Sequence, residues 1–471
     1  MDSRISARSL AAALGGWRGS GPVYEALADA IRLLCLDNRL VPHTALPAER
    51  ELAAALGLSR TTVAAAYASL RDTAHIRSIR GSGSVTLPLA RRDPGIRPGQ
   101  ADAIDLQQAS PPAWPGLAGV FAEVAARATT LVARAGYDVV GQRELREAVA
   151  RRYRERGLPT RAEEVLVTPG AQSAIHLLAA VLTARADRVL LETPTYPHAA
   201  DAFRRAGGRL VSVPVTTRDG WDLDRAEQAF ARTLPTLAYL MPTFQNPTGR
   251  TMTPVEAEAI ARAADRAGTI LIADETTAEL AIDGPPADPF AAVPGVIRIG
   301  SLGKTVWGGL RVGWIRAPEE TIARLAAARP VHDLGTPEFE QAVAVELLAR
   351  MTEIVAQRSA HLRAGRDALT AALRAALPAW RVPEVAGGVS LWVGLDAPLS
   401  APLVMAARAR GLYLSAGARF AVEGGHDRHL RVPFTAPVDD LERAAAILAE
   451  SWSVAASTGG DGRFERLEAV V

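Results

Sequence analysis

Residues 301–314 read SLGKTVWGGLRVGW and include Lys304, the one lysine in a chain of 471 residues. The other 52 of the 53 lysine and arginine residues are arginines. Arginine serves as well as lysine for solubility and for most ion pairs, but its guanidinium stays protonated and cannot form a Schiff base. Lys304 is therefore a candidate for covalent chemistry at a carbonyl carbon. The alternative is that one lysine survived by chance.

The residues around Lys304 can hold a phosphate group. Ser301 supplies a hydroxyl, the glycines let backbone amides approach closely, and Arg311 adds a guanidinium seven residues after the lysine. A phosphate cradle beside a reactive amine fits pyridoxal 5'-phosphate. The segment also resembles the lysine motif of fold type I aminotransferases. This resemblance implies that Lys304 forms the internal aldimine while Ser301 and Arg311 hold the phosphate.

Two earlier segments resemble further motifs of that family, in the expected order. Residues 168–173, TPGAQS, follow a predicted strand and open an apolar helix, so their backbone N–H groups form an anion site. The resemblance implies a second phosphate contact at Gly170, Ala171 and Gln172. Residues 242–249, PTFQNPTG, resemble the motif whose asparagine, here Asn246, hydrogen-bonds the phenolic oxygen of the cofactor. Asn246 is also expected to face the substrate or effector.

Two side chains are expected at the pyridine ring. Tyr196, in PTYP at 194–197, matches the aromatic residue that stacks on the ring, although alone it would be interpreted as a core aromatic. Asp274 ends a predicted strand at the carboxyl edge of a parallel sheet, where ligands bind. Its carboxylate can pair with the ring nitrogen and keep the ring an electron sink, with helix capping as the alternative. Thr276 replaces a tyrosine that the family commonly has, which suggests a differently tuned aldimine pKa.

Two more residues extend the resemblance. Tyr137, in GYDVVG at 136–141, resembles the tyrosine that fold type I proteins send across the dimer interface to the partner's phosphate, which implies a homodimer with shared sites. Arg431, in LRVPF at 430–434, resembles the arginine that clamps the α-carboxylate of a substrate or effector. A surface ion pair is the alternative for Arg431.

Composition divides the chain near residue 90. Residues 17–87 are expected to form a mainly helical unit, and residues 88–103, rich in proline and arginine, a semi-rigid linker. From 104 to 456, short apolar strands alternate with alanine-rich helices, which predicts an α/β domain with a mostly parallel sheet. A small α+β subdomain is expected from about 345 to 456, and a disordered tail from 457 to 471.

Two helices that meet at a tight turn are predicted in the N-terminal unit. Gly57 interrupts an apolar face of helical spacing, and Ser59 is a suitable N-cap for the second helix. The first turn of that helix then carries Arg60 and two threonines, whose side chains suit phosphates and base edges in a major groove. Residues 77–84 have the composition of a hairpin wing.

The runs LPAERELA at 46–53 and LSRTTV at 58–63 closely resemble the winged helix-turn-helix of GntR-type transcription factors. The resemblance implies double-stranded DNA, in the form of a promoter operator, as a partner. The residues expected to contact DNA are Arg50, Ser59, Arg60, Thr61, Thr62, Arg77, Arg80 and Ser82. A three-helix module for binding other proteins is the alternative.

A GntR-like winged helix joined to an aminotransferase-like domain resembles the MocR/GabR group of regulators along nearly the whole chain. The resemblance implies a transcriptional regulator that senses pyridoxal phosphate, an amino acid or amine effector, or both, through aldimine formation at Lys304. Two other hypotheses stay open. The protein could be an active aminotransferase that carries a DNA-binding module, or a regulator whose cofactor pocket is a relic.

Composition excludes several other classes of protein. With 48% hydrophobic and 22% charged residues, the chain has no apolar run of the 18 residues that a membrane span needs. The N-terminus lacks the features of a secretory signal, and the single cysteine, Cys35, cannot form an internal disulfide, so a cytoplasmic protein is expected. No metal site is predicted. The net charge of +2 is too small to indicate nucleic acid, so DNA contacts must be concentrated locally.

Overall fold

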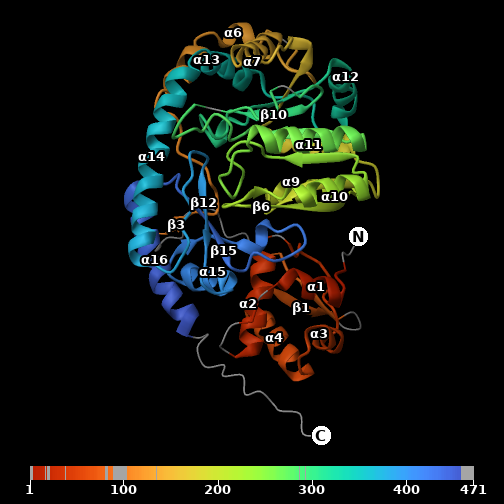
Figure 1. The fold of residues 1–471 in the computed structure, drawn as a ribbon, viewed down its shortest axis with the longest axis vertical. Coiled ribbons are helices and arrows are strands. Elements are labelled where there is room, and N and C mark those ends of the chain that lie inside the picture. Colours follow the sequence, from red (N-terminus) through yellow and green to blue (C-terminus); the bar gives the residue numbers. More distant parts are fainter. Residues whose placement is uncertain are drawn as a thin grey trace.

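The computed structural model describes residues 4–15, 17–18, 22–37, 39–79, 83–88, 103–133, 135–285, 287–291 and 293–457. These residues form a helical N-terminal unit, drawn in red in Figure 1, a large sheet with helices on both faces, and a small α+β unit, drawn in blue. The expected linker, apart from residues 88 and 103, and the expected tail beyond Ser457 lie outside the described residues.

The N-terminal unit is a helical bundle with a hairpin. Its elements are α1 (Ala7–Leu14), α2 (Val23–Leu36), α3 (Glu49–Leu56), α4 (Arg60–Asp72), β1 (Ile76–Ile79) and β2 (Gly83–Thr86). Gly57 ends α3 in the left-handed conformation, with φ 64°, which glycine adopts without a steric penalty. Ser59 caps α4 by accepting a hydrogen bond from the Thr62 N–H at 3.1 Å. The expected helix-turn-helix therefore forms, and β1 pairs antiparallel with β2 as its wing.

The strands of the large sheet lie in the order β4-β11-β10-β9-β8-β5-β6-β7. Their bounds are β4 (Val165–Thr168), β5 (Arg188–Thr193), β6 (Arg209–Thr216), β7 (Gly220–Trp221), β8 (Leu237–Leu240), β9 (Ile270–Asp274), β10 (Ile297–Ser301) and β11 (Gly313–Arg316). Neighbouring strands are parallel from β10 to β6, whereas β11 is antiparallel to β10 and β4. This arrangement confirms the expected α/β fold with a mostly parallel sheet.

Helices cover both faces of the sheet, which is why its central strands are mostly apolar on both faces. One face packs against α8, α9 and α12, and the other against α10 and α11. The helices of the large unit are α5 (Leu117–Ala125), α6 (Ala128–Leu131), α7 (Arg143–Glu155), α8 (Ala171–Leu182), α9 (Pro197–Arg205), α10 (Leu223–Thr233), α11 (Pro254–Ala267), α12 (Glu319–Ala328) and α13 (Glu338–Ala349). The long α14 (Met351–Ala376) leads from the large unit to the small one (Figure 1).

The small unit is built on a three-stranded antiparallel sheet in the order β12-β15-β14. Its elements are β12 (Ser390–Gly394), α15 (Ser400–Ala409), β13 (Leu412–Tyr413), β14 (Ser415–Ala416), β15 (His429–Pro433) and α16 (Val438–Ser457). The short β3 (Ile104–Asp105) pairs with β13, so Ile104 and Leu106 join this core. They lie outside the expected limits of 345–456. Those limits remain a prediction.

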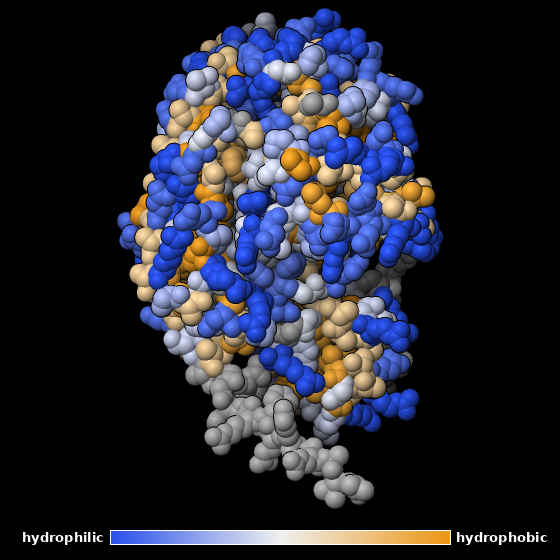
Figure 2. Space-filling view, in the orientation of Figure 1, coloured by the Kyte–Doolittle hydropathy of each residue, from blue (hydrophilic) through white to orange (hydrophobic). Residues whose placement is uncertain are grey.

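The N-terminal unit lies against the small unit. Helix α2 packs beside α15 (Figure 1), and Leu33 of α2 is buried in the core of the small unit. No helix within the described ranges is long and apolar enough to span a bilayer. Figure 2 shows that hydrophilic side chains predominate on this face of the molecule and that hydrophobic ones gather only in small groups.

A buried arginine on α14 holds the loop that carries Lys304. The inward face of α14 is apolar at helical spacing, with Ile354 and Leu362 on either side of Arg358. The Arg358 guanidinium donates hydrogen bonds of 2.8–2.9 Å to the backbone oxygens of Pro112, Thr305 and Val306. Arg358 is only 6% exposed. Arg358 is therefore the donor to the Pro112 and Thr305 oxygens, whereas the Val306 oxygen also accepts a hydrogen bond of 3.0 Å from the Trp114 N–H.

We expect Arg358→Leu to lower the free energy of unfolding by about 2 kcal/mol, because the loss of the guanidinium leaves buried carbonyls without a donor. Urea denaturation followed by circular dichroism measures this change. The matched control is Arg374→Leu on the same helix, where a half-exposed arginine makes a loose ion pair of 3.6 Å with Glu384. The control should change the free energy by no more than about 0.5 kcal/mol. Equal losses in the two variants would contradict the anchoring role.

Candidate cofactor site and DNA-binding surface

A cavity of about 640 Å³ lies at the carboxyl ends of β9 and β10, between the large sheet and the small unit. This edge of an open α/β sheet is where ligands bind. Many of the residues predicted from the sequence line the cavity, namely Ala171, Gln172, Tyr196, Asn246, Asp274, Ser301, Lys304, Arg311 and Arg431. The fold therefore brings together side chains that are far apart in the sequence.

Lys304 lies just beyond the end of β10. Its Nζ donates a hydrogen bond of 2.6 Å to the backbone oxygen of Ala109. Burial, together with the guanidinium groups of Arg431 and Arg311, lowers the pKa of Lys304 to about 8, against the opposing effect of Asp274. A larger fraction of this amine is therefore unprotonated near neutral pH than of an exposed lysine, as a nucleophile requires.

Asp274 is the last residue of β9 and is almost completely buried. Its Oδ1 accepts a hydrogen bond of 2.9 Å from the Thr276 N–H, and its Oδ2 accepts one of 2.5 Å from the Tyr239 hydroxyl. Burial raises the pKa of Asp274, whereas Tyr239, Thr276 and Lys304 lower it. Sequence reasoning missed Tyr239, because a tyrosine inside an apolar strand is indistinguishable from a core aromatic.

The turn before α8 and the loop after Lys304 form the expected phosphate end of the cavity. Gly170 has φ 87°, and a Cβ there would lie 2.5 Å from an Arg311 guanidinium nitrogen. A Cβ on Gly313 would lie 2.7 Å from the Gly170 carbonyl carbon. Both glycines therefore allow the two segments to approach. The Arg311 guanidinium donates to the Pro169 oxygen at 2.9 Å, and the Ser301 hydroxyl accepts from the Gly303 N–H at 3.0 Å.

Tyr196 borders the cavity directly before α9. Its hydroxyl lies 3.1 Å from His198 Nδ1, and the two rings meet edge to face at 5.3 Å. Burial, with Asp274 nearby, raises the pKa of Tyr196 to about 12. The hydroxyl is therefore protonated at neutral pH. The ring is half-buried, packs against the core of the large sheet and also borders the cavity, so its role at the cofactor ring remains a prediction.

The loop that carries Asn246 is held by a buried carboxylate, which sequence reasoning also missed. Glu192 accepts hydrogen bonds from the Trp221 indole at 3.0 Å and from the Gln245 amide at 3.1 Å. Burial raises the pKa of Glu192 to about 7. The Gln245 amide also donates to the Pro194 oxygen at 2.7 Å, so the segments of Tyr196 and Asn246 are joined. A glutamate inside the apolar strand 188–193 was the available signal.

Arg431 lies on β15 and is only 6% exposed, and it forms no surface ion pair with any residue that the structure describes. Its guanidinium donates to the backbone oxygen of Gln107 at 2.5 Å and lies 4.8 Å from the centre of the Phe420 ring. Burial lowers its pKa to about 10, which still leaves it protonated at neutral pH. The cavity therefore presents a desolvated cation, as carboxylate binding requires.

Tyr137 does not line the cavity. Its side chain is 76% exposed, and Asp138 pairs with Gly335 to place this segment beside the exposed Val331 and Leu334. The expected contact with the partner subunit's phosphate remains a prediction. Large exposed apolar side chains of this kind often mark an interface between proteins.

The residues expected to contact DNA lie at the start of α4 and on the wing. Arg50, Arg60, Thr61 and Arg77 are exposed, and Thr62 is half-exposed. The Arg60 guanidinium lies 3.5 Å from Glu49, in an ion pair that solvent screens. Ser59 is used as the helix cap. Arg80 and Ser82 lie outside the described residues.

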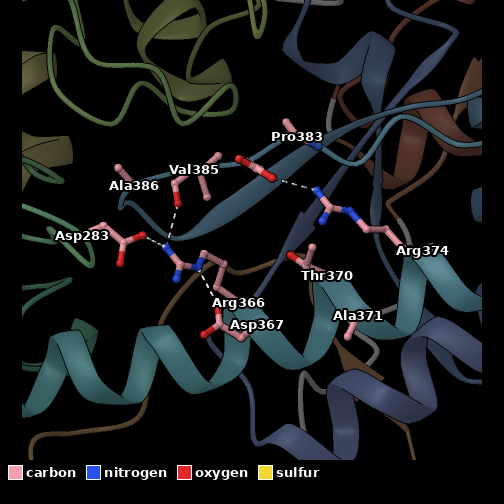
Figure 3. A pocket seen from close by; sticks show the side chains of 10 residues that line it. Asp283, Arg366, Asp367, Thr370, Ala371, Arg374, Pro383, Val385 and Ala386 are labelled. Carbon is pink, nitrogen blue, oxygen red and sulfur yellow. Dashed lines mark hydrogen bonds and ion pairs between the residues drawn. The ribbon is translucent and has the colours of Figure 1, made fainter.

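A second cavity, of about 580 Å³, lies beside α14 and is shown in Figure 3. Arg366 pairs there with Asp283 and Asp367, and Arg374 pairs with Glu384. These charges satisfy one another across the cavity. The cavity at the sheet edge, in contrast, is lined by Asn246 and Arg431, each of which has a buried polar atom without a hydrogen-bond partner among the described residues.

The sequence profile described as aminotransferase class I and II matches residues 122–448. The chain belongs to this family. A second profile, described as bacterial regulatory proteins of the gntR family, matches residues 23–85, from the start of α2 into the wing. This aminotransferase-family chain therefore carries a GntR-type helix-turn-helix at its N-terminal end, as expected.

Two regulators are among its relatives. The uncharacterized HTH-type transcriptional regulator YdcR of Escherichia coli is 27% identical over 446 residues, which are 87% of this chain and 94% of YdcR. The probable rhizopine catabolism regulatory protein MocR of Rhizobium meliloti is 28% identical, over 64% of this chain and 66% of MocR. These relatives and the two profiles confirm the resemblance to MocR-type regulators.

The crystal structure of LysN, an α-aminoadipate aminotransferase from Thermus thermophilus, is similar with a TM-score of 0.69 and 28% identity. The match covers 75% of this chain and 93% of LysN, which is complexed with N-(5'-phosphopyridoxyl)-L-leucine. The fold is therefore that of a family whose structures hold pyridoxal phosphate derivatives.

The residues of the cavity in this chain fit the same cofactor. Asn246 Oδ1 and Arg431 Nε are buried and have no hydrogen-bond partner among the described residues. Such atoms are rare in folded proteins unless a ligand or water satisfies them. With the amine of Lys304 and the glycine-lined turn beside Arg311, they supply hydrogen-bond donors and one acceptor for an aldehyde that carries a phosphate.

We expect the protein to capture pyridoxal phosphate at a rate that rises with pH through about 8, because the lowered pKa of Lys304 makes the amine neutral above that pH. Stopped-flow visible absorption at a series of pH values measures this rate. Lys304→Arg, which keeps the charge but cannot condense with an aldehyde, should remove the absorption band. A band that persists in this variant, or a midpoint near the 10.5 of an exposed lysine, would contradict the assignment.

Proposed function

We propose that the protein is a pyridoxal phosphate-dependent transcriptional regulator. Its aminotransferase-like unit senses the cofactor, an amino compound, or both, through covalent chemistry at Lys304. One observation carries the proposal. Residues 107–109, which directly follow the connection to the DNA-binding unit and β3, provide the backbone oxygens that accept hydrogen bonds from Arg431 and Lys304.

A ligand in the cavity has to compete for both of these hydrogen bonds. An α-carboxylate bound by Arg431 competes with the Gln107 oxygen, and covalent use of the Lys304 amine removes a donor from the Ala109 oxygen. The segment that loses these bonds begins at β3, close to the end of the linker. Loss of these two hydrogen bonds would therefore release the segment that leads to the DNA-binding unit. A two-state switch requires a change of this kind.

The cofactor roles follow from the positions of the residues. When bound, pyridoxal phosphate supplies an aldehyde that condenses with amines and a ring that withdraws electrons. Asp274 would hold the ring nitrogen and Tyr196 would cover the ring. Asn246 would donate to the phenolic oxygen, and the turn at 170–172 would bind the phosphate together with Ser301 and Arg311. Tyr239 would orient the Asp274 carboxylate through their hydrogen bond.

The partners follow from the surface. The first turn of α4 and the exposed wing residue Arg77 suit a promoter operator in duplex DNA. The exposed Tyr137, Val331 and Leu334 support a homodimer that shares its cofactor sites and presents two helix-turn-helix units. A regulator of this kind acts where the chromosome is, so we place the protein in the cytoplasm.

An active aminotransferase is the second candidate function. It is favoured by the presence of Lys304, Asp274 and Arg431 in one cavity, since these residues provide an amine base, an electrostatic partner for the ring and a carboxylate clamp. Multiple-turnover transamination at an ordinary enzyme rate, with DNA affinity independent of ligands, would favour this function over regulation.

We expect the affinity of the cofactor-loaded protein for its operator to change when an amino compound binds. The operator can be selected from random duplex DNA, and fluorescence anisotropy then measures affinity with and without ligands. Arg60→Ala should weaken binding by about 1–3 kcal/mol. Arg225→Ala, an exposed arginine on α10, is the control and should bind as the parent does. Equal affinity in all ligand states would contradict the sensing role.

We expect Tyr137→Phe to weaken cofactor binding about tenfold, because the phosphate of the partner subunit loses a hydrogen bond. Mixing this variant with Lys304→Ala tests whether the site is shared. A mixed dimer contains one site with both changes and one with neither, so cofactor binding of normal affinity should return in part. Tyr24→Phe, on the exposed side of α2, is the control. A monomer in sedimentation, or no recovery on mixing, would contradict a shared site.

A further inference from the structure

The DNA-binding unit forms part of the rim of the cofactor cavity. Leu36 and Asp37, at the C-terminal end of α2, line the cavity together with Arg419 of the small unit. Leu33, one turn earlier, is buried in the core of the small unit. This contact fixes the end of α2 at the edge of the cavity. A ligand there could therefore contact the DNA-binding unit directly.

Asp37 is an anion in an unfavourable position. It caps the C-terminal end of α2, where the carbonyl dipoles repel a negative charge. Burial has the largest effect on Asp37 and raises its pKa. Arg419, Arg39 and Arg408, in that order, offset part of this effect, and the resulting pKa is about 6. Asp37 makes no ion pair with any described residue. Its principal electrostatic attraction is therefore to Arg419, across the contact between the two units.

Arg419 has unused capacity for an anion. Its side chain is 11% exposed, and one guanidinium nitrogen pairs with Asp201 on α9 at 2.9 Å. The remaining donors of a guanidinium fork are available to a second carboxylate. Arg204, which pairs with the same Asp201 at 3.4 Å, and Arg39 of the DNA-binding unit add further positive charge.

The charges of the cavity are distributed unevenly. Its lining carboxylates are Asp274, which is held at the ring end by Tyr239 and Thr276, and Asp37. Arg431 and Arg419 both lie at the end formed by the small unit. Lys304 and Arg311 are assigned to the cofactor, so the described lining cation left for the side chain of an amino acid held at Arg431 is Arg419.

We propose that Arg419 forms a subsite for a second anionic group of an amino-acid effector, and that Asp37 of the DNA-binding unit competes with this group for Arg419. The ligand class is an α-amino acid with a carboxylate on its side chain. Occupation of the subsite removes the electrostatic part of the contact between the end of α2 and the small unit, and the packing of Leu33 remains. The inference rests on the proposed function, because it requires an amino acid bound in this cavity with its α-carboxylate on Arg431.

The test compares diacids with neutral amino acids of similar length. The cofactor-loaded full-length protein is titrated with L-glutamate and L-2-aminoadipate, and with L-glutamine and L-norleucine, by visible absorption and calorimetry. We expect the diacids to bind at least about tenfold more tightly, the range of a charge-assisted hydrogen bond. Arg419→Gln should bring this ratio close to one, and Arg419→Lys should keep part of it. Arg205→Gln on α9, outside the cavity lining, is the control and should keep the full ratio.

Asp37 is tested by removal of its charge. Asp37→Asn should raise the affinity for diacids at least about threefold, because the competing anion is gone, and should leave the affinity for norleucine as it was. Glu25→Gln, in the first turn of α2, is the matched control and should change neither affinity. Hydrogen exchange of α2 should increase when a diacid binds and should not increase with norleucine.

The outcomes separate this inference from the proposed function. Binding of neutral amino acids and diacids with equal affinity would overturn the Arg419 subsite and leave the sensor intact. Failure of every amino acid to bind the cofactor-loaded protein would overturn both. A diacid preference that Asp37→Asn does not strengthen, with unchanged exchange in α2, would overturn the competition between Asp37 and the ligand.

Discussion

The Arg358 guanidinium donates to three backbone oxygens on two loops, and the lysine end of the candidate site depends on this contact. Two of the oxygens belong to Thr305 and Val306, directly after Lys304, and the third belongs to Pro112, shortly after Ala109. The lysine and the carbonyl that accepts its hydrogen bond are therefore both held against α14. A flexible side chain can then deliver its amine to a fixed point, which covalent chemistry at a bound carbonyl requires.

The second constraint on the site is that two carboxylates lie in the interior of the protein at the edge of the sheet. Asp274 and Glu192 are both fully enclosed, and each is surrounded by donors from neighbouring strands and loops. Isolated buried carboxylates would be costly, but such networks make them stable and fix their orientation. Glu192 holds the loop of Asn246, and Tyr239 holds Asp274. The polar network therefore shapes the ring end of the cavity before any ligand is present.

The two units of this aminotransferase-family chain meet at the cavity in two independent ways. The segment at 107–109 follows the linker and contacts Arg431 and Lys304, and the end of α2 brings Asp37 near Arg419. Both contacts use charged groups that a bound amino acid would also need. Under the proposed function, ligand binding and the position of the DNA-binding unit would be coupled through competition for the same donors, with no long pathway through the core.

The sequence by itself determined the fold class, the helix-turn-helix and nine of the residues that line the cavity. Lys304 was identified by composition, and Gly57 and Ser59 by the local conformations that a left-handed turn and an N-cap require. Signals of this kind are local, since each depends on residues within a few positions of one another. Tertiary structure alone decided the positions of Tyr239, Arg358, Asp37 and Arg419 around the cavity. Their partners come from elements far away in the sequence, and a polar residue in an apolar strand or helix face does not reveal which distant group will meet it.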